Sequence, residues 1–202
     1  EKERELFILY AQRRALRDFH FAVEWEKASV WGLTKARLLP LTLTFFLSFG
    51  SVITYTLFHN VTKKYALYIA MAPLISNVGG NHGLITASSV MRGLATVSFN
   101  RLSVVVKEVL AGVVCGLILG AIGGIIALVG YKSVPMALTV ICSLVCALAT
   151  SGLFGTCAPI FFSWLRIDPA RVAGPMETTI QDFVTYSSYF LFLQLFMRLF
   201  GE

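Results

Sequence analysis

Long apolar runs separated by short polar connections fill most of the chain after residue 37. An α-helix needs roughly 20 apolar residues to cross the hydrocarbon core of a bilayer, and each run is about that long or longer. The pattern predicts five transmembrane helices, at residues 38–58, 65–95, 104–130, 136–165 and 175–200. Only 14% of the residues are charged, against roughly a quarter in a soluble domain, so we expect an all-α membrane protein with five spans per protomer.

Residues 1–37 have a different pattern, because charged residues alternate with apolar positions at helical spacing. The spacing predicts an N-terminal amphipathic helix, either solvated in the cytosol or lying on the membrane surface. Trp25 and Trp31 favour the surface position, since tryptophan concentrates at membrane interfaces. We therefore divide the chain into an interfacial helix (1–37) and a transmembrane pore domain (38–202).

The distribution of basic residues predicts the orientation. With the N-terminus inside, 13 of the 17 Lys and Arg residues lie on the cytosolic side of the predicted spans and four lie outside. Short loops rich in Lys and Arg stay in the cytosol. We expect a multi-pass protein of the cell membrane, with a cytosolic N-terminus and an external C-terminus.

The third span carries glycine at every fourth position: Gly112, Gly116, Gly120 and Gly124. Small residues at this spacing allow two helix backbones to approach closely. This pattern predicts a tight helix pair.

The second span holds the segment PLISNVGGNHGLITAS, residues 73–88, in which Pro, Gly and amide residues interrupt the apolar run. We expect Pro73 and the glycines to break this helix, and irregular backbone at membrane depth is tolerated where it lines an aqueous cavity. Side-chain oxygens such as those of Asn77, Asn81 and Thr86 suit hard cations such as Mg²⁺ or Ca²⁺. For His82 two interpretations stay open, a hydrogen-bonded histidine within the fold and a metal ligand.

Acidic residues occur in or beside the spans at Glu108, Asp168, Glu177 and Asp182. Ionisable groups at such positions are costly and usually face a pathway or a partner. Asp168, Pro175, Thr179 and Asp182 are spaced by seven, four and three residues, which places them on one face of a helix. The pattern predicts a cation-facing stripe, although Asp168 before a proline is also typical of a helix N-cap.

Residues 73–95, the KEVLAG segment at 107–112 and DPARVAGPMETTIQD at 168–182 together resemble the transmembrane domain of the MgtE family of magnesium channels and transporters. The resemblance implies a homodimer with one central pore, lined mainly by the second and fifth spans of both subunits. Asp168 matches the pore aspartate that holds a hydrated Mg²⁺, Asn81 the asparagine of the break, and Glu108 the glutamate of the third span. Glu177 stands where the family usually has an apolar residue.

These observations predict a divalent cation channel or transporter that moves Mg²⁺ into the cytosol, with Asp168, Asn81, Glu108, Thr179 and Asp182 as the metal-contacting residues. An ion-coupled exchanger is the first alternative, because a broken helix also supports alternating access. A membrane-embedded enzyme using His82 and an acid, and a purely structural subunit, are further alternatives. We expect no catalytic activity and no nucleic-acid partner; the expected partners are a second subunit, the bilayer and divalent ions.

Overall fold

The computed structural model describes residue 23 and residues 26–96, 100–167 and 169–201, and every regular element in these ranges is helical. The elements are α2 (Val30–Leu57), α3 (His59–Lys64), the 3-10 helix η1 (Tyr68–Met71), α4 (Ala72–Thr96), α5 (Arg101–Tyr131), α6 (Val134–Trp164) and α7 (Pro169–Leu199). The predicted all-α class is therefore confirmed. Three of the described helices, α2, α5 and α6, are long and apolar enough to cross a membrane.

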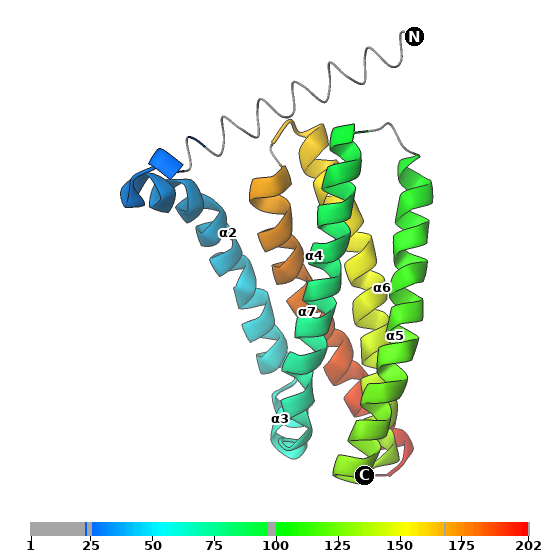
Figure 1. The fold of residues 1–202 in the computed structure, drawn as a ribbon. Helices are drawn as coiled ribbons and strands as arrows, with labels where there is room; N and C mark the ends of the chain where they lie inside the picture. The colour runs from blue at the N-terminus through cyan, green and yellow to red at the C-terminus, as the bar shows by residue number, and fades with distance from the viewer. Residues whose placement is uncertain (1–22, 24–25, 97–99, 168, 202) are drawn as a thin grey trace.

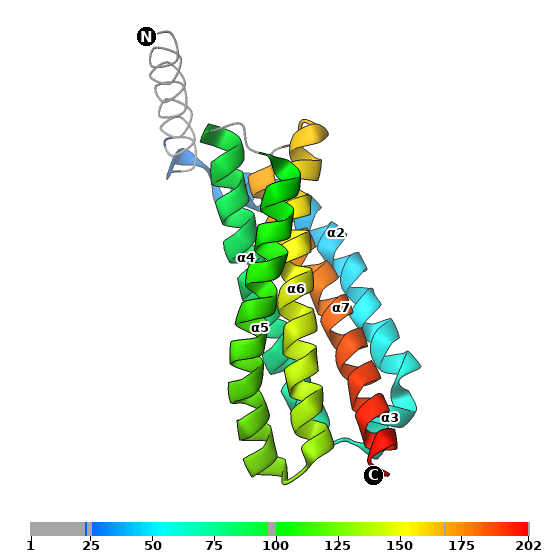
Figure 2. The same ribbon diagram turned by 90° about the vertical axis from the view of Figure 1, so that its right-hand side faces the viewer.

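The five long helices lie side by side in one bundle, with α3 and the C-terminus at one end and the start of α2 at the other (Figures 1 and 2). Helix α6 is central, because it packs against α4, α5 and α7. Helix α2 packs chiefly against α7. Helices α4 and α7, which carry most of the predicted site, pack against each other and against α6, and α7 also packs against α2.

The glycine row of α5 faces α6, and the tight helix pair that its spacing predicted is confirmed. All four glycines are buried, and a Cβ at Gly112 would lie 2.2 Å from the backbone oxygen of Leu148. Gly152 of α6 matches this arrangement, since a Cβ there would lie 2.6 Å from the backbone oxygen of Glu108. The α5–α6 pair depends on the absence of side chains at these positions.

The lower part of α7 is anchored in an apolar core. Tyr189, Phe190, Leu193 and Met197 are completely buried and belong to one cluster with Met136 and other residues of α6. The Tyr189 hydroxyl donates a hydrogen bond of 2.5 Å to the backbone oxygen of Tyr68 in η1. This contact ties α7 to the segment that leads into α4.

The structure corrects two expectations about helix continuity. The prediction that Pro73 and the glycines break the second helix is wrong, since α4 is continuous from Ala72 to Thr96. Pro73 is tolerated because it lies in the first turn, and the buried Gly79 and Gly83 serve close contacts with neighbouring helices. The last helix begins at Pro169 rather than at Pro175, which lies inside α7.

Candidate functional site

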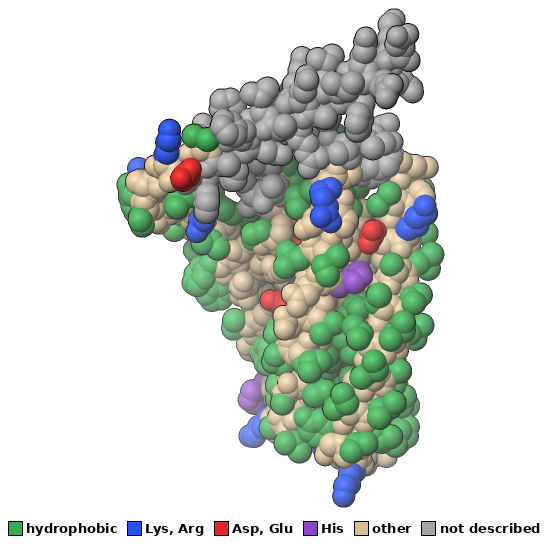
Figure 3. Space-filling view, viewed as in Figure 1, with side chains coloured by type: hydrophobic (Ala, Val, Ile, Leu, Met, Phe, Trp, Pro, Cys, Tyr) green, Lys and Arg blue, Asp and Glu red, His purple; other side chains and the backbone are tan. Residues whose placement is uncertain are grey.

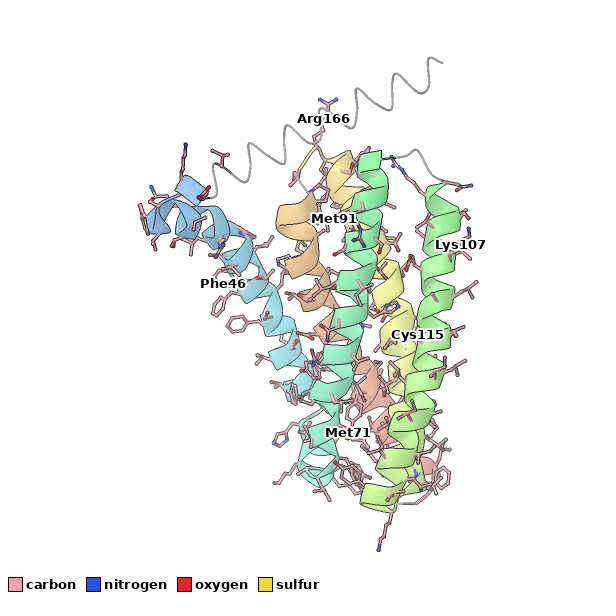
Figure 4. All side chains as sticks on the ribbon, viewed as in Figure 1. Phe46, Met71, Met91, Lys107, Cys115 and Arg166 are labelled. Atoms are coloured by element: carbon pink, nitrogen blue, oxygen red, sulfur yellow. The ribbon has the colours of Figure 1, made fainter. Side chains whose placement is uncertain are left out.

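Lys and Arg side chains gather near the two ends of the bundle, and hydrophobic side chains cover most of its middle (Figure 3). The side chain of Phe46, for example, points outward from α2 and is 65% exposed (Figure 4). One end carries Lys27, Lys35, Arg37, Arg92, Arg101, Lys107 and Arg166, and the opposite end carries Lys63, Lys64, Lys132 and Arg198. The polar groups between these ends therefore lie within an otherwise apolar layer.

A first polar pair joins α4 to α7. The Ser76 hydroxyl donates a short hydrogen bond to Oδ1 of Asp182, which is half-buried. Thr179 lies one turn earlier on α7 and is buried, and its hydroxyl donates to the backbone oxygen of Pro175 at 2.8 Å. The Ser76 contact therefore uses only one of the two carboxylate oxygens of Asp182. The hydroxyl proton of Thr179, in contrast, is donated within its own helix.

A second polar pair joins α4 to α5. The Thr86 hydroxyl donates to Oε2 of Glu108 at 3.1 Å, and Glu108 is half-buried. Thr86 follows Ser76 by ten residues on the same helix. At 1.5 Å of rise per residue the two carboxylates are thus held at levels about 15 Å apart along α4.

Helix α4 also carries exposed polar side chains, two of them between these levels. Asn81 donates from Nδ2 to Oδ1 of Asn77 at 3.4 Å, and both residues are exposed. Ser88, exposed as well, follows Asn81 by seven residues, or about two turns, so the three side chains share one face of the helix. Lipid offers no hydrogen-bond partners to such a face.

Two predicted features lie outside the described residues. One of them is Asp168. The Asp-Pro pair was typical of a helix start, and α7 does begin at Pro169. The other is the amphipathic helix predicted in residues 1–37, most of which falls in residues 1–22 and 24–25. Of the five predicted metal-contacting residues, the structure therefore places Asn81, Glu108, Thr179 and Asp182, and these lie on three different helices.

Glu177 is the least expected group in the bundle. Its side chain is completely buried, and neither carboxylate oxygen has a hydrogen-bond partner within the described residues. It lies directly against Gly83 of α4, where a Cβ would come 1.7 Å from Oε1. The carboxyl group of Glu177 therefore occupies the space that a side chain at position 83 would fill.

Sequence reasoning missed Gln181, which is also completely buried. Its Nε2 donates to the backbone oxygen of Ala147 at 2.7 Å and to the hydroxyl of Thr185 at 3.1 Å. The amide thereby links α7 to α6 beside Asp182. Ser76 was missed too, because a serine in an apolar helix carries no signal of its own.

The described residues contain no group of three or more His, Cys, Asp or Glu side chains placed to hold a metal ion. The four cysteines are free. Within a single subunit, the carboxylates of Asp182 and Glu108 thus lie at two different levels along α4 and do not form one metal site.

A family model described as a divalent cation transporter, MgtE, matches residues 72–192, which includes α4, α5, α6 and most of α7. The chain belongs to the MgtE family. This is a family of transporters rather than enzymes.

Three curated relatives bear the name magnesium transporter MgtE. The protein of Bacillus subtilis is 28% identical over 167 residues, which are 81% of this chain and 37% of that protein. That of Enterococcus faecalis is 27% identical over 171 residues, 82% of this chain and 37% of that protein. The relative from Thermus thermophilus is 29% identical over 129 residues, 62% of this chain and 28% of that protein. The chain spans less than two fifths of the length of these relatives.

Proposed function

We propose that the chain forms the membrane part of a passive pathway for Mg²⁺ into the cytosol, with the pore on the axis of a homodimer. The observation that carries the proposal is the set of polar groups on α4 and α7 inside a bundle of the MgtE family. The family model is that of a divalent cation transporter, and the named relatives are magnesium transporters.

In this proposal all five long helices cross the bilayer. Helices α4 and α7 have 25 and 31 residues, enough to span the hydrocarbon core, and their lower hydropathy comes from the polar groups that would line the pore. The end of the bundle that carries more basic residues faces the cytosol, which leaves the C-terminus outside.

The homodimer is supported by the polar face of α4. Asn77, Asn81 and Ser88 are exposed in the single chain, and exposed amides are costly against lipid. A two-fold partner would turn this face toward a shared axis and would double each carboxylate. We expect Asp168 and Asp182 to attract the ion there, with Asn81, Thr179 and Glu108 as further contacts.

A carboxylate pore suits Mg²⁺ because this ion dehydrates reluctantly and is usually held through its water shell. Carboxylates that bind the hydrated ion provide charge without demanding full dehydration. The same arrangement, with two polar levels about 15 Å apart along α4, gives the ion successive positions of attraction rather than one tight site.

Coupled exchange remains the second candidate function, and ion dependence separates the two. Liposomes containing this chain and a Mg²⁺-sensitive dye should show Mg²⁺ entry down its gradient without any Na⁺ or H⁺ gradient. Asp182→Asn should reduce this entry, whereas Glu26→Gln, which changes an exposed acid before α2, should leave it unchanged. Entry that requires an opposing Na⁺ or H⁺ gradient would contradict the passive mechanism.

A further inference from the structure

His82 has a defined hydrogen-bonding role on α4. Its Nδ1 lies 2.8 Å from the hydroxyl oxygen of Ser151 on α6, and that hydroxyl donates to the backbone oxygen of Leu148 at 3.0 Å. In the arrangement in which Ser151 donates to this carbonyl, Nδ1 carries the proton that joins the ring to Ser151. The lone pair of the neutral imidazole is then on Nε2.

A carboxylate is held beside this imidazole. Thr86, which fixes Oε2 of Glu108, follows His82 by four residues on α4, so the two side chains are neighbours on one face with about 5–6 Å between their Cβ atoms. His82 and Glu108 are both half-buried in the single chain.

We infer that Nε2 of His82 and the carboxylate of Glu108 form a binding site for a first-row transition-metal divalent cation such as Co²⁺, Ni²⁺ or Zn²⁺, completed by water. Imidazole nitrogen suits these metals, whereas Mg²⁺ takes oxygen ligands. A metal-binding histidine typically donates its other ring N–H to a partner that fixes its orientation, and Ser151 has that position here. The inference deepens the proposed function, and rests on it for the route by which divalent cations reach α4.

The test uses the full chain without a histidine tag, in which His20 and His59 are replaced by asparagine. His82 is then the remaining histidine of the three in the sequence. Co²⁺ binding to the detergent-solubilised protein is measured by titration calorimetry, and Cu²⁺ is used in parallel for its electron paramagnetic resonance spectrum. We expect Co²⁺ to bind at one site per chain, and the Cu²⁺ signal to show coupling to one imidazole nitrogen.

Three further substitutions in this background locate the site. His82→Asn retains an N–H group near the position of Nδ1 but has no Nε2, and should weaken Co²⁺ binding at least about tenfold, as should Glu108→Gln. Ser151→Ala should weaken it by about 10- to 100-fold through loss of ring orientation, with the nitrogen coupling still present. The matched control is His59→Asn in the otherwise wild-type chain, which should leave Co²⁺ binding at His82 unchanged, since His59 is an exposed residue of α3 at the opposite end of the bundle.

Wild-type Co²⁺ affinity in a folded His82→Asn protein would overturn the inference, and so would a Cu²⁺ spectrum without nitrogen coupling. The proposed function is tested separately by Mg²⁺ entry into liposomes containing the wild-type chain. Absence of Mg²⁺ entry together with Co²⁺ binding at His82 would overturn the proposed function and leave the metal site standing.

Discussion

Replacing Gly83 by alanine tests how closely α4 approaches α7. The new Cβ would lie 1.7 Å from Oε1 of Glu177 and 2.2 Å from its Cδ, so one of the two groups must move. Glu177 is completely buried, so the end of its side chain can move only within the packed interior. Overpacking of this kind costs about 1–3 kcal/mol, and alanine returns about 1 kcal/mol of helix propensity. From the severity of the overlap we expect a net loss of about 2 kcal/mol.

Thermal unfolding of the detergent-solubilised protein measures this loss. For a chain of this size each kcal/mol shifts the midpoint by about 2–4 °C, so Gly83→Ala should lower Tm by about 4–8 °C. Gly80→Ala is the matched control on the same helix, because its Cβ would meet only Thr178 Cγ2 at 3.8 Å. That variant should melt at the wild-type temperature or slightly above it.

A double-mutant cycle identifies the clashing group. Adding Glu177→Ala to Gly83→Ala should recover part of the lost stability, with a coupling energy of at least about 1 kcal/mol. Gly155→Ala should not be rescued in this way, because its Cβ would lie 2.6 Å from the backbone oxygen of Gly83. A Gly83→Ala protein as stable as Gly80→Ala, or a coupling energy near zero, would refute the reasoning.

Three other predictions concern the pore and the packing around it. Asp168→Asn and Asp182→Asn should each reduce Mg²⁺ entry into liposomes at least about tenfold. The reason is that a charge about 5 Å from a divalent ion contributes roughly 6 kcal/mol of attraction at a dielectric of about 20 before desolvation. Unchanged Mg²⁺ entry in a folded variant would show that the substituted residue is not part of the pathway. Gly112→Leu should lower the free energy of unfolding by about 3 kcal/mol, because even a Cβ there meets the α6 backbone at 2.2 Å, and a wild-type melting temperature would contradict this contact. Gln181→Leu removes the hydrogen bond from α7 to the Ala147 carbonyl, which still accepts from Thr150, and should cost about 0.5–1.5 kcal/mol in the same melting assay; no loss would show that the amide does not hold α6 and α7 together.

The sequence was most informative where the apolar runs were uninterrupted. Helices α5 and α6 begin and end within three residues of the predicted spans 104–130 and 136–165. Their starts are capped by Asn100 and Ser133, whose side chains accept from backbone N–H groups of the first turn. Here local sequence and the length of the membrane layer are sufficient to define the helix.

Prediction failed where proline and glycine have a tertiary role. Gly79 and Gly83 were interpreted as helix breakers, but they lie inside α4 because Gln181 and Glu177 of α7 occupy the space beside them. Such contacts join residues about 100 positions apart, and no local pattern records them. The last predicted span began at Pro175, whereas α7 begins at Pro169, directly after the aspartate of the Asp-Pro pair that is typical of a helix start.

In the candidate site, too, the sequence indicated some residues and gave no signal for others. Asn81, Glu108 and Asp182 stand out in the sequence because polar residues are rare within apolar runs. Their partners were harder to find, since Ser76 became meaningful only when α4 and α7 were side by side. The predicted roles of the metal-contacting residues stay predictions, and that of Asp168 depends on a residue outside the described ranges.

The most direct test of passive Mg²⁺ passage is the reversal potential of the current carried by this chain in a planar bilayer with Mg²⁺ as the permeant cation. One unit charge crossing 100 mV corresponds to about 2.3 kcal/mol, so a divalent ion balances a tenfold concentration ratio at about 30 mV. A passive Mg²⁺ pore should shift its reversal potential by about 30 mV for each tenfold change in Mg²⁺, regardless of Na⁺ or pH gradients. A reversal potential that instead follows Na⁺ or pH, or no Mg²⁺ current from the folded protein, would contradict the account.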